Sequence, residues 1–271
     1  MLGSLTVVGT GMDAFRHLTP ESRAAIESAD KVFYCVCDAA AELLIRSMNK
    51  NCEDLFPLYS EEVSRTVTYR QMTEKVVQEV KSGSNVCMIF YGHPGVCATS
   101  THAALRAVRK AGAKARMLPA ISSHDALCAE LGVDLGLAGC QIYEATSYLT
   151  HDRSYDVDTY LILYQLAAIG DLNYYENGFP KICLHLLTSR LVDQYGSDHP
   201  CILYTAANMP FLECSITKLT VGQLSDANVF MAHTLLVLPK SQPPRNTSII
   251  DTIHEIRDRY YKETGRPQKA E

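Results

Sequence analysis

Short apolar runs alternate with amphipathic stretches along the first 119 residues of the chain. The runs are bounded by glycine or polar residues, as buried strands are, and they predict strands at residues 4–11, 31–36, 52–55, 86–90 and 113–119. The stretches with helical spacing lie at residues 20–29, 39–48, 71–82 and 100–111. Thr19 as N-cap and Pro20 at the first helical position indicate where the first helix starts. This alternation predicts a mostly parallel sheet with helices on both faces.

The pattern changes after Pro119, because several strand-like runs follow one another without helices between them. We expect strands at residues 141–144, 160–165, 201–204 and 234–239, and helices at 124–131 and 181–195. Such an order predicts a mixed sheet. The tail from Lys240 is Pro-rich, then helical from Ser248 to about Lys262, and we expect residues 265–271 to be disordered. We therefore divide the chain into an N-terminal α/β domain (1–119), a C-terminal α/β domain (120–240) and a tail (241–271).

A Gly-Pro-Gly bend at Tyr91–Val96 follows the strand at 86–90 and leads into the helix at 100–111. In open α/β sheets, ligands bind at the carboxyl ends of the strands. Gly92 and Gly95 allow a ligand to approach the backbone, and Pro94 stiffens the bend. A strand-to-helix turn without a ligand has the same pattern. The Gly9-Thr10-Gly11 turn resembles half of a dinucleotide fingerprint, which is a weak signal by itself.

Composition narrows the class of protein. The chain has 271 residues, of which 47% are hydrophobic and 20% charged, as in globular proteins with a substantial core. Its net charge of −5 and the lack of a basic run argue against nucleic acid as a partner. There is no apolar run long enough to span a membrane and no signal-peptide pattern at residues 1–5, so we expect a cytoplasmic protein.

The ten cysteines are scattered and include no CxxC pair, and the histidines show no metal-ligand spacing. Several cysteines lie in apolar runs, where cysteine serves as a small hydrophobic residue. We therefore expect reduced thiols and no metal site.

Several motifs together resemble the tetrapyrrole methylase family. They are Val8–Gly11, Ala29–Tyr34, Tyr91–Gly95 and Pro119–Ser122. A closer similarity, over residues 3–240, is to the methyltransferase domain of borosin precursors, the group of the omphalotin enzyme. It rests on Asn51–Leu55, Tyr59, Arg65, Thr68–Tyr69, Gln71–Met72, Tyr91–Val96, Arg116–Pro119, Tyr143–Ala145 and Tyr204–Pro210.

The resemblance implies the class III methyltransferase fold, in which two unlike α/β domains hold S-adenosyl-L-methionine in the cleft between them. It also implies transfer of methyl groups to backbone amide nitrogens of a ribosomally made peptide, with S-adenosyl-L-homocysteine as the second product. A homodimer is expected, whose two subunits both contribute to the channel through which the peptide enters.

The chain also departs from the borosin pattern. Ala120 stands where the family often has glycine, and Phe56 where fungal relatives have tyrosine. The fungal enzymes carry their substrate as a C-terminal extension, whereas Glu271 ends this sequence without an apolar core peptide. We therefore expect a precursor peptide supplied in trans, as in the split bacterial borosins, and possible assembly into a heterotetramer with it.

Tyr59, Arg65 and Tyr69 are the candidate catalytic residues that the resemblance places. An amide nitrogen is a poor nucleophile, because its lone pair is delocalised into the carbonyl group. The enzyme must therefore remove the N–H proton while stabilising negative charge on the carbonyl oxygen. We expect Tyr59 to act as the base, with its phenolate favoured by a nearby arginine, and Arg65 and Tyr69 to donate to the oxygen. A solvated polar loop has the same residue types.

The cofactor-binding positions are also carried over from the resemblance. They are Tyr91, His93, Val96, Ser122, Ser123, Gln165, Tyr204, Ala206 and Thr234. Backbone N–H groups near Ser122 and Ser123 suit the methionine carboxylate, and backbone groups of Gln165 and Ala206 suit the adenine. We interpret the pairs Tyr174-Tyr175 and Tyr260-Tyr261 as packing or partner surface.

Three alternatives share this fold or its cofactor. A tetrapyrrole or other small-molecule methyltransferase would not need the set of Tyr59, Arg65 and Tyr69, and a catalytically silent cofactor sensor would not retain it. An rRNA methyltransferase is disfavoured by the net charge of −5.

Overall fold

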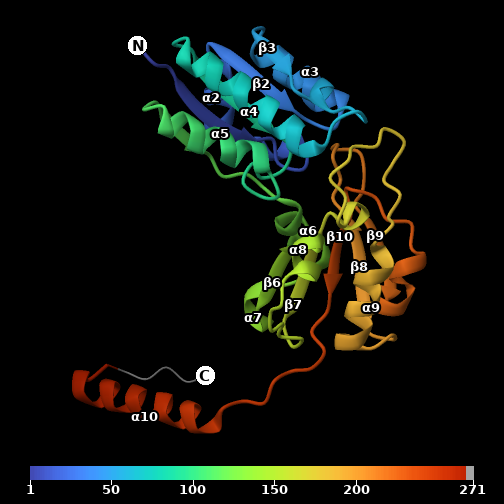
Figure 1. The fold of residues 1–271 in the computed structure, drawn as a ribbon. Helices are drawn as coiled ribbons and strands as arrows, with labels where there is room; N and C mark the ends of the chain where they lie inside the picture. Colours follow the sequence, from blue (N-terminus) through green and yellow to red (C-terminus); the bar gives the residue numbers. More distant parts are fainter. Residues whose placement is uncertain (267–271) are drawn as a thin grey trace. The chain divides into compact units, whose positions relative to one another are not determined.

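The first sheet is formed by five parallel strands. We describe a computed structural model over residues 1–266 (Figure 1). The strands are β1 (Ser4–Gly9), β2 (Lys31–Cys35), β3 (Cys52–Asp54), β4 (Asn85–Phe90) and β5 (Lys114–Met117), in the order β3-β2-β4-β1-β5. Every pairing among them is parallel, which confirms the prediction.

Alternate side chains of these strands face opposite helical layers, as the two-residue period of a strand requires. Val7 and Met88 belong to the cluster that packs against α4 (Arg65–Lys81) and α5 (Thr99–Lys110). Val8 and Ile89 belong to the cluster on the other face, with α2 (Pro20–Glu27) and α3 (Ala39–Met48). The predicted N-cap is also present, since the Thr19 side chain accepts from the Ser22 N–H. Helices on both faces of the sheet are thereby confirmed.

Helix α4 starts at Arg65, six residues before the predicted start. The inner face of the helix is formed by Arg65, Thr68, Met72, Val76 and Val80, all of which are buried. Arg65 and Thr68 are polar, so hydrophobic periodicity does not indicate that the first two turns are helical. Arg65 and Tyr69 therefore lie on a helix rather than in a solvated loop. The opposite deviation occurs at α9 (Leu184–Tyr195), which starts after Lys181 because that residue has a φ of +54°.

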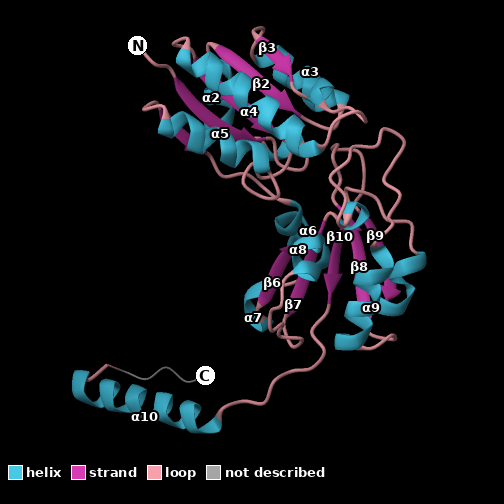
Figure 2. Cartoon of the chain, in the orientation of Figure 1, coloured by secondary structure: helices cyan, strands magenta, loops and turns pink. Residues whose placement is uncertain are grey.

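The second sheet is mixed, as expected (Figure 2). Its strands are β6 (Cys140–Glu144), β7 (Tyr160–Tyr164), β8 (Pro200–Thr205), β9 (Ser215–Thr220) and β10 (Thr234–Val237), in the order β6-β7-β10-β8-β9. The β6–β7 pair is parallel and the other pairs are antiparallel. Strand β9 was not predicted, because it is a mostly exposed edge strand without an alternating buried face.

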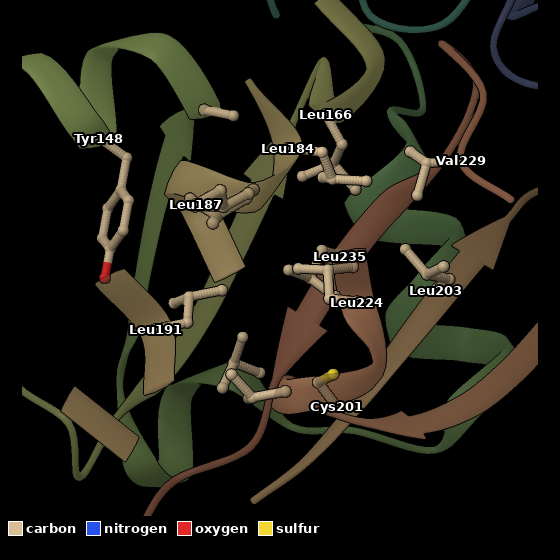
Figure 3. Close-up of a cluster of buried hydrophobic side chains, with 14 of the residues drawn as sticks. Tyr148, Leu166, Leu184, Leu187, Leu191, Cys201, Leu203, Leu224, Val229 and Leu235 are labelled. Carbon is tan, nitrogen blue, oxygen red and sulfur yellow. The ribbon is translucent and has the colours of Figure 1, made fainter. Parts of the chain in front are cut away.

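Leucines fill one face of the second sheet (Figure 3). Leu187 and Leu191 from α9 meet Leu203 and Leu235 from the strands, and all four are almost completely buried. The remaining short helices are α1 (Ala14–His17), α6 (Ser123–Leu131), α7 (Leu135–Ala138) and α8 (Ala145–Thr150), with 3₁₀ turns η1 (Phe56–Leu58), η2 (Leu166–Ala168) and η3 (Val221–Asp226). This core fixes the strand ends from which the candidate site is built.

The residues from Met1 to Lys240 form one compact unit, and those from Ser241 onward form another. The first sheet ends at Met117 and the second begins at Cys140, but a domain boundary at residue 119 stays a prediction. The second unit contains the predicted tail helix, α10 (Thr247–Thr264). Of the residues expected to be disordered, 267–271 lie outside the described part of the chain. No helix among residues 1–266 is both long and apolar enough to cross a bilayer.

Candidate active site

Three loops at the carboxyl ends of β1, β4 and β5 meet at Gly9. A Cβ atom on Gly9 would lie 2.1 Å from the Gly92 carbonyl oxygen, 2.7 Å from Pro94 Cδ and 2.8 Å from Ala120 Cβ. Gly11 and Gly92 are joined by reciprocal backbone hydrogen bonds of 3.3 and 2.9 Å. The two Gly-rich turns of the sequence therefore form one structure at the sheet edge where parallel α/β folds bind ligands.

The His93 side chain supports its own loop. Its Nδ1 accepts a 3.0 Å hydrogen bond from the Gly95 N–H, and His102 Nε2 lies 2.9 Å from the Gly95 carbonyl oxygen. Burial lowers the pKa of His93, and His124 and His102 lower it further against the opposing effect of Asp125. The imidazole is therefore neutral near pH 7, with one nitrogen already occupied.

The start of α6 is closed by a capping box. The Ser122 N–H donates to Asp125 Oδ2 at 2.7 Å, and Ser122 Oγ contacts the same oxygen at 2.5 Å. Burial raises the pKa of Asp125, but the hydrogen bonds from Ser122 outweigh it and hold the pKa below its usual value. Of the backbone N–H groups near Ser122 and Ser123 that are expected to bind the methionine carboxylate, the Ser122 N–H is therefore already occupied by a carboxylate of the protein, and the binding of the methionine carboxylate at this helix start stays a prediction.

Hydroxyl groups from three elements gather beside this helix start. The Tyr164 hydroxyl lies 2.8 Å from His124 Nδ1, and Thr234 Oγ1 lies 3.3 Å from Ser123 Oγ. Val96 packs against the apolar cluster that contains Tyr164. The structure thus brings Ser123 and Thr234 together and places Val96 against the apolar cluster that also contains Tyr204 and Ala206.

The other predicted cofactor residues offer less side-chain chemistry. Tyr204 is fully buried, and its hydroxyl donates to Glu130 at 2.7 Å, so only its backbone is available. Ala206 is buried in the same cluster as Tyr204. Gln165 follows β7 with a left-handed φ of +59°, which turns the chain sharply at the strand end.

Tyr91 connects the Gly-rich bend to the predicted catalytic residues. About half of its surface is exposed, at 51%, yet the surrounding protein raises the pKa of its phenol, as do Cys37, Cys35 and Cys97. Tyr69 also contributes to this shift. A side chain that is accessible and yet densely surrounded is typical of the wall of a concave site.

Tyr59 and Tyr69 lie together, as the candidate catalytic set requires. Their rings are 6.3 Å apart at 88°, an edge-to-face arrangement. Burial raises the pKa of Tyr59 well above its ordinary value, and Tyr69, Cys35 and Tyr91 raise it further. Burial and these neighbours thus outweigh any stabilisation of the phenolate by a nearby arginine, and the role of Tyr59 as base stays a prediction. Tyr59 is a neutral phenol near pH 7.

The Arg65 side chain is directed to a loop that follows β7. It is 6% exposed, and one terminal nitrogen donates to the Asp171 carbonyl oxygen at 2.6 Å. The guanidinium carbon lies 5.4 Å from the centre of the Phe179 ring. Its Nε is buried without a hydrogen-bond partner among the described residues, so the guanidinium group has an unused N–H donor.

Tyr174 and Phe56 are two further aromatic neighbours of Tyr59, and sequence reasoning did not assign the first of them to the site. The Tyr174 ring lies 5.2 Å from the Tyr59 ring, and the Phe56 ring lies 5.5 Å from it. Phe56 is the position at which fungal relatives have tyrosine, and the sequence indicates only packing or partner surface for Tyr174. No local pattern predicts that Tyr174 reaches Tyr59, because 115 positions separate them in sequence.

The rest of the described chain offers no competing site of two common kinds, a metal centre or a pocket that contains the candidate residues. Among residues 1–266, no three His, Cys, Asp or Glu side chains are grouped as metal ligands. A surface groove lined by residues of α8 and α9 contains none of the candidate catalytic or cofactor residues. The candidate site is therefore the set of strand-end loops with Tyr59, Tyr69 and Tyr91.

Replacing Gly95 with valine should weaken cofactor binding through the loop. A Cβ at this position would lie 3.0 Å from Met117 Sδ and 3.1 Å from His93 Cε1, so the branched side chain must displace the imidazole. Calorimetry should show at least ~10-fold lower affinity for S-adenosylmethionine, while circular dichroism shows a retained fold. Thr99→Val is a control close to the same bend, since it places a valine side chain at an exposed position. Unchanged affinity in Gly95→Val would remove this loop from the site.

Comparison with known proteins identifies the family. A model of the tetrapyrrole (corrin/porphyrin) methylases matches residues 4–224. The methyltransferase/ribosomally synthesized cyclic peptide dendrothelin A precursor of Dendrothele bispora is 40% identical over 252 residues, which are 92% of this chain and 60% of the relative. The omphalotin A precursor of Omphalotus olearius gives the same values. The chain thus spans about 60% of the length of these relatives.

Solved structures agree in fold. Uroporphyrin-III-C-methyltransferase from Thermus thermophilus superposes with a TM-score of 0.63 at 19% identity, covering 91% of this chain and all of that one. The cobalamin biosynthetic enzyme cobalt precorrin-4 methyltransferase superposes with a TM-score of 0.62 at 15% identity, covering 89% of this chain and 96% of that one. The predicted fold class is confirmed, and the chain belongs to the tetrapyrrole (corrin/porphyrin) methylase family.

Proposed function

We propose that this protein uses S-adenosyl-L-methionine to methylate backbone amide nitrogens of a ribosomally synthesized precursor peptide. The observation that carries the proposal is the 40% identity, over 92% of the chain, to relatives that are methyltransferases joined to cyclic peptide precursors. The proteins similar in fold alone are below 20% identity, so the small-molecule methyltransferase alternative has weaker support.

The Tyr59 environment suits the removal of an amide proton. An amide N–H is far less acidic than any ordinary side chain, so a base for it must itself be strong. Burial raises the pKa of Tyr59, which makes its phenolate a stronger base than an exposed tyrosine but a rarer species at neutral pH. The proposed reaction therefore depends on the loss of the Tyr59 proton when the peptide and cofactor are in place.

Arg65 and Tyr69 are proposed to stabilise the amide oxygen. As the amide nitrogen loses its proton, negative charge moves to the carbonyl oxygen, which accepts hydrogen bonds more strongly. The Arg65 Nε is buried without a hydrogen-bond partner among the described residues, and the Tyr69 ring lies against Tyr59, so these two side chains are the donors of the proposal. The peptide nitrogen then carries the electron pair that attacks the methyl group.

The residues at the strand-end loops fit a cationic, zwitterionic cofactor. The ionised Asp125 carboxylate beside Ser122 suits an ammonium group rather than a carboxylate, and the Ser123 and Thr234 hydroxyls suit a ribose. Bound S-adenosylmethionine would supply an electrophilic methyl group and leave as S-adenosylhomocysteine. In this proposal it is held by Tyr91, His93, Val96, Ser122, Ser123, Gln165, Tyr204, Ala206 and Thr234.

Mass spectrometry tests the proposed function. The protein is co-expressed with a separate peptide that ends in an apolar, Val/Ile/Leu-rich segment, which also tests delivery of the precursor in trans. The proposal predicts added mass in whole methyl units, located on backbone nitrogens by fragmentation. The small-molecule alternative is tested by incubating the protein and labelled S-adenosylmethionine with a corrinoid and, separately, with the peptide. Transfer of label to the corrinoid alone would overturn the peptide assignment.

The proposal includes a homodimer with a C₂ interface. A soluble sample at micromolar concentration should scatter light as twice the 30.0 kDa chain, and addition of the peptide should raise that mass if a heterotetramer forms. A mass of one chain under these conditions would contradict the dimer.

A further inference from the structure

A loop from the second half of the chain is fixed to the predicted catalytic segment. We call residues 170–182, between η2 and α9, the bridging loop. Its backbone turns at Gly170, Gly178 and Lys181, which have φ values of +69°, +101° and +54°. The segment it contacts is residues 56–65, which carries Tyr59 and ends at Arg65.

Backbone and charged groups fix the bridging loop to this segment at two places. The Arg65 N–H donates to the Leu172 carbonyl oxygen at 2.7 Å, and the Arg65 side chain donates to the Asp171 carbonyl oxygen at 2.6 Å. Further along, the Glu176 N–H donates to Glu61 Oε1 at 2.9 Å. Tyr174 lies between these two attachments, so its position relative to the segment is restrained on both sides.

The Tyr174 ring packs directly on Tyr59. The ring centres are 5.2 Å apart with an angle of 33° between planes, which is the shortest of the three aromatic contacts that Tyr59 makes. Tyr174 also meets Phe56 edge-on at 6.2 Å. Phe56 and Tyr69 belong to the first α/β part of the chain, whereas Tyr174 alone comes from the bridging loop. One of the aromatic residues around Tyr59 therefore comes from outside the first α/β part of the chain.

We propose that Tyr174 is a positioning residue, which holds the Tyr59 ring in its working orientation and keeps water from the Tyr59 hydroxyl. The inference rests on the proposed function for its consequence in catalysis, but the contact between the two rings does not. The important group is the Tyr174 ring rather than its hydroxyl, because both aromatic contacts are made by the ring. A phenylalanine at position 174 should therefore keep the positioning role, whereas an alanine should lose it.

The experiment compares Tyr174→Ala, Tyr174→Phe and a control on the same loop. Leu172→Ala is the control, since the Leu172 side chain is more than half exposed and only its backbone carbonyl holds Arg65. Tyrosine ring carbons are labelled with ¹³C, the Tyr59 resonance is assigned by its loss in Tyr59→Phe, and its chemical shift is followed against pH. This readout needs no substrate.

We expect Tyr59 to titrate at lower pH in Tyr174→Ala, because burial raises the Tyr59 pKa and the substitution admits water. Tyr174→Phe and Leu172→Ala should titrate as the parent does. Peptide methylation by Tyr174→Ala should fall about 10-fold or more in kcat, with S-adenosylmethionine affinity unchanged, because a displaced catalytic group costs rate rather than cofactor binding.

Two results would overturn the inference. One is a Tyr59 titration in Tyr174→Ala that matches the parent, and the other is a Tyr174→Phe protein that behaves like Tyr174→Ala. A parent protein that methylates no peptide would refute the proposed function instead, and the shifted titration in Tyr174→Ala would still support the positioning of Tyr59.

Discussion

Peptide methylation should fall at least ~10²-fold when Tyr59 is replaced by phenylalanine, the usual size of a general-base contribution. The substitution removes only the phenolic oxygen and keeps the ring that packs between Phe56, Tyr69 and Tyr174. Binding of S-adenosylmethionine should stay within a few-fold, because the predicted cofactor residues lie on other loops. Single-turnover rates with saturating cofactor, together with calorimetry, measure both quantities.

The pH dependence of the reaction provides a second measure of the same residue. Since burial raises the Tyr59 pKa above the ordinary value near 10, the phenolate fraction should still be increasing at pH 9 to 10. The methylation rate of the parent should therefore rise with pH across this range without a plateau, and Tyr59→Phe should lose that rise.

Tyr195→Phe is a matched control for the loss of one phenolic oxygen. Tyr195 is buried in the core of the second sheet, and its hydroxyl has no hydrogen-bond partner among the described residues. This variant should keep the parent rate. A normal rate in Tyr59→Phe would move the base to Tyr69, and full activity in both Tyr59→Phe and Tyr69→Phe would refute the proposed mechanism.

Replacing Arg65 with lysine should lower the methylation rate about 10²-fold, as the loss of one oxyanion donor does in other enzymes. Lysine keeps the positive charge but loses the planar fork, which in Arg65 binds the Asp171 carbonyl oxygen and leaves Nε for another acceptor. Steady-state kinetics should show the loss in kcat rather than in the KM for S-adenosylmethionine.

Arg70→Lys on the same helix is the control for this substitution. Arg70 is two-thirds exposed and lies 3.8 Å from Glu74, so its exchange should leave rate and stability unchanged. Thermal unfolding of Arg65→Lys shows how much of its effect comes from the loosened attachment to the bridging loop. A fully active Arg65→Lys would mean that only the charge at this position matters.

The fold was largely predictable, because its strands and helices have the periodicities that a buried core requires. The exceptions have identifiable physical causes. Helix α4 buries Arg65 and Thr68 in its first turns, so hydrophobic spacing detects only the part that starts near Met72. Strand β9 is held by its pairing with β8 and exposes most of its side chains. Its sequence therefore lacks the alternation of buried apolar and exposed polar residues that predicts a strand.

The candidate site was predictable in its residue types but not in its interactions. Backbone N–H groups near Ser122 and Ser123 were expected to suit the methionine carboxylate, but the one on Ser122 donates to Asp125, three positions later. Arg65 was expected to donate to the amide oxygen and to lie near Tyr59, and its binding to carbonyl and aromatic groups of the bridging loop was not foreseen. Tyr174 reaches Tyr59 only through tertiary structure. Spacing along the chain could not reveal which of several possible partners each polar group finds.

The attachment of Arg65 to the bridging loop has a consequence for how this part of the protein can diverge. Both hydrogen-bond acceptors are main-chain carbonyl oxygens, those of Asp171 and Leu172, which every amino acid provides. Substitution of the exposed Leu172 side chain therefore leaves the attachment intact. Inserting or deleting a residue between Gly170 and Tyr174 would instead displace both the Tyr174 ring and the carbonyl groups that bind Arg65. We expect related chains to vary the side chains at positions 172 and 173 freely while keeping the number of residues from 170 to 174 constant.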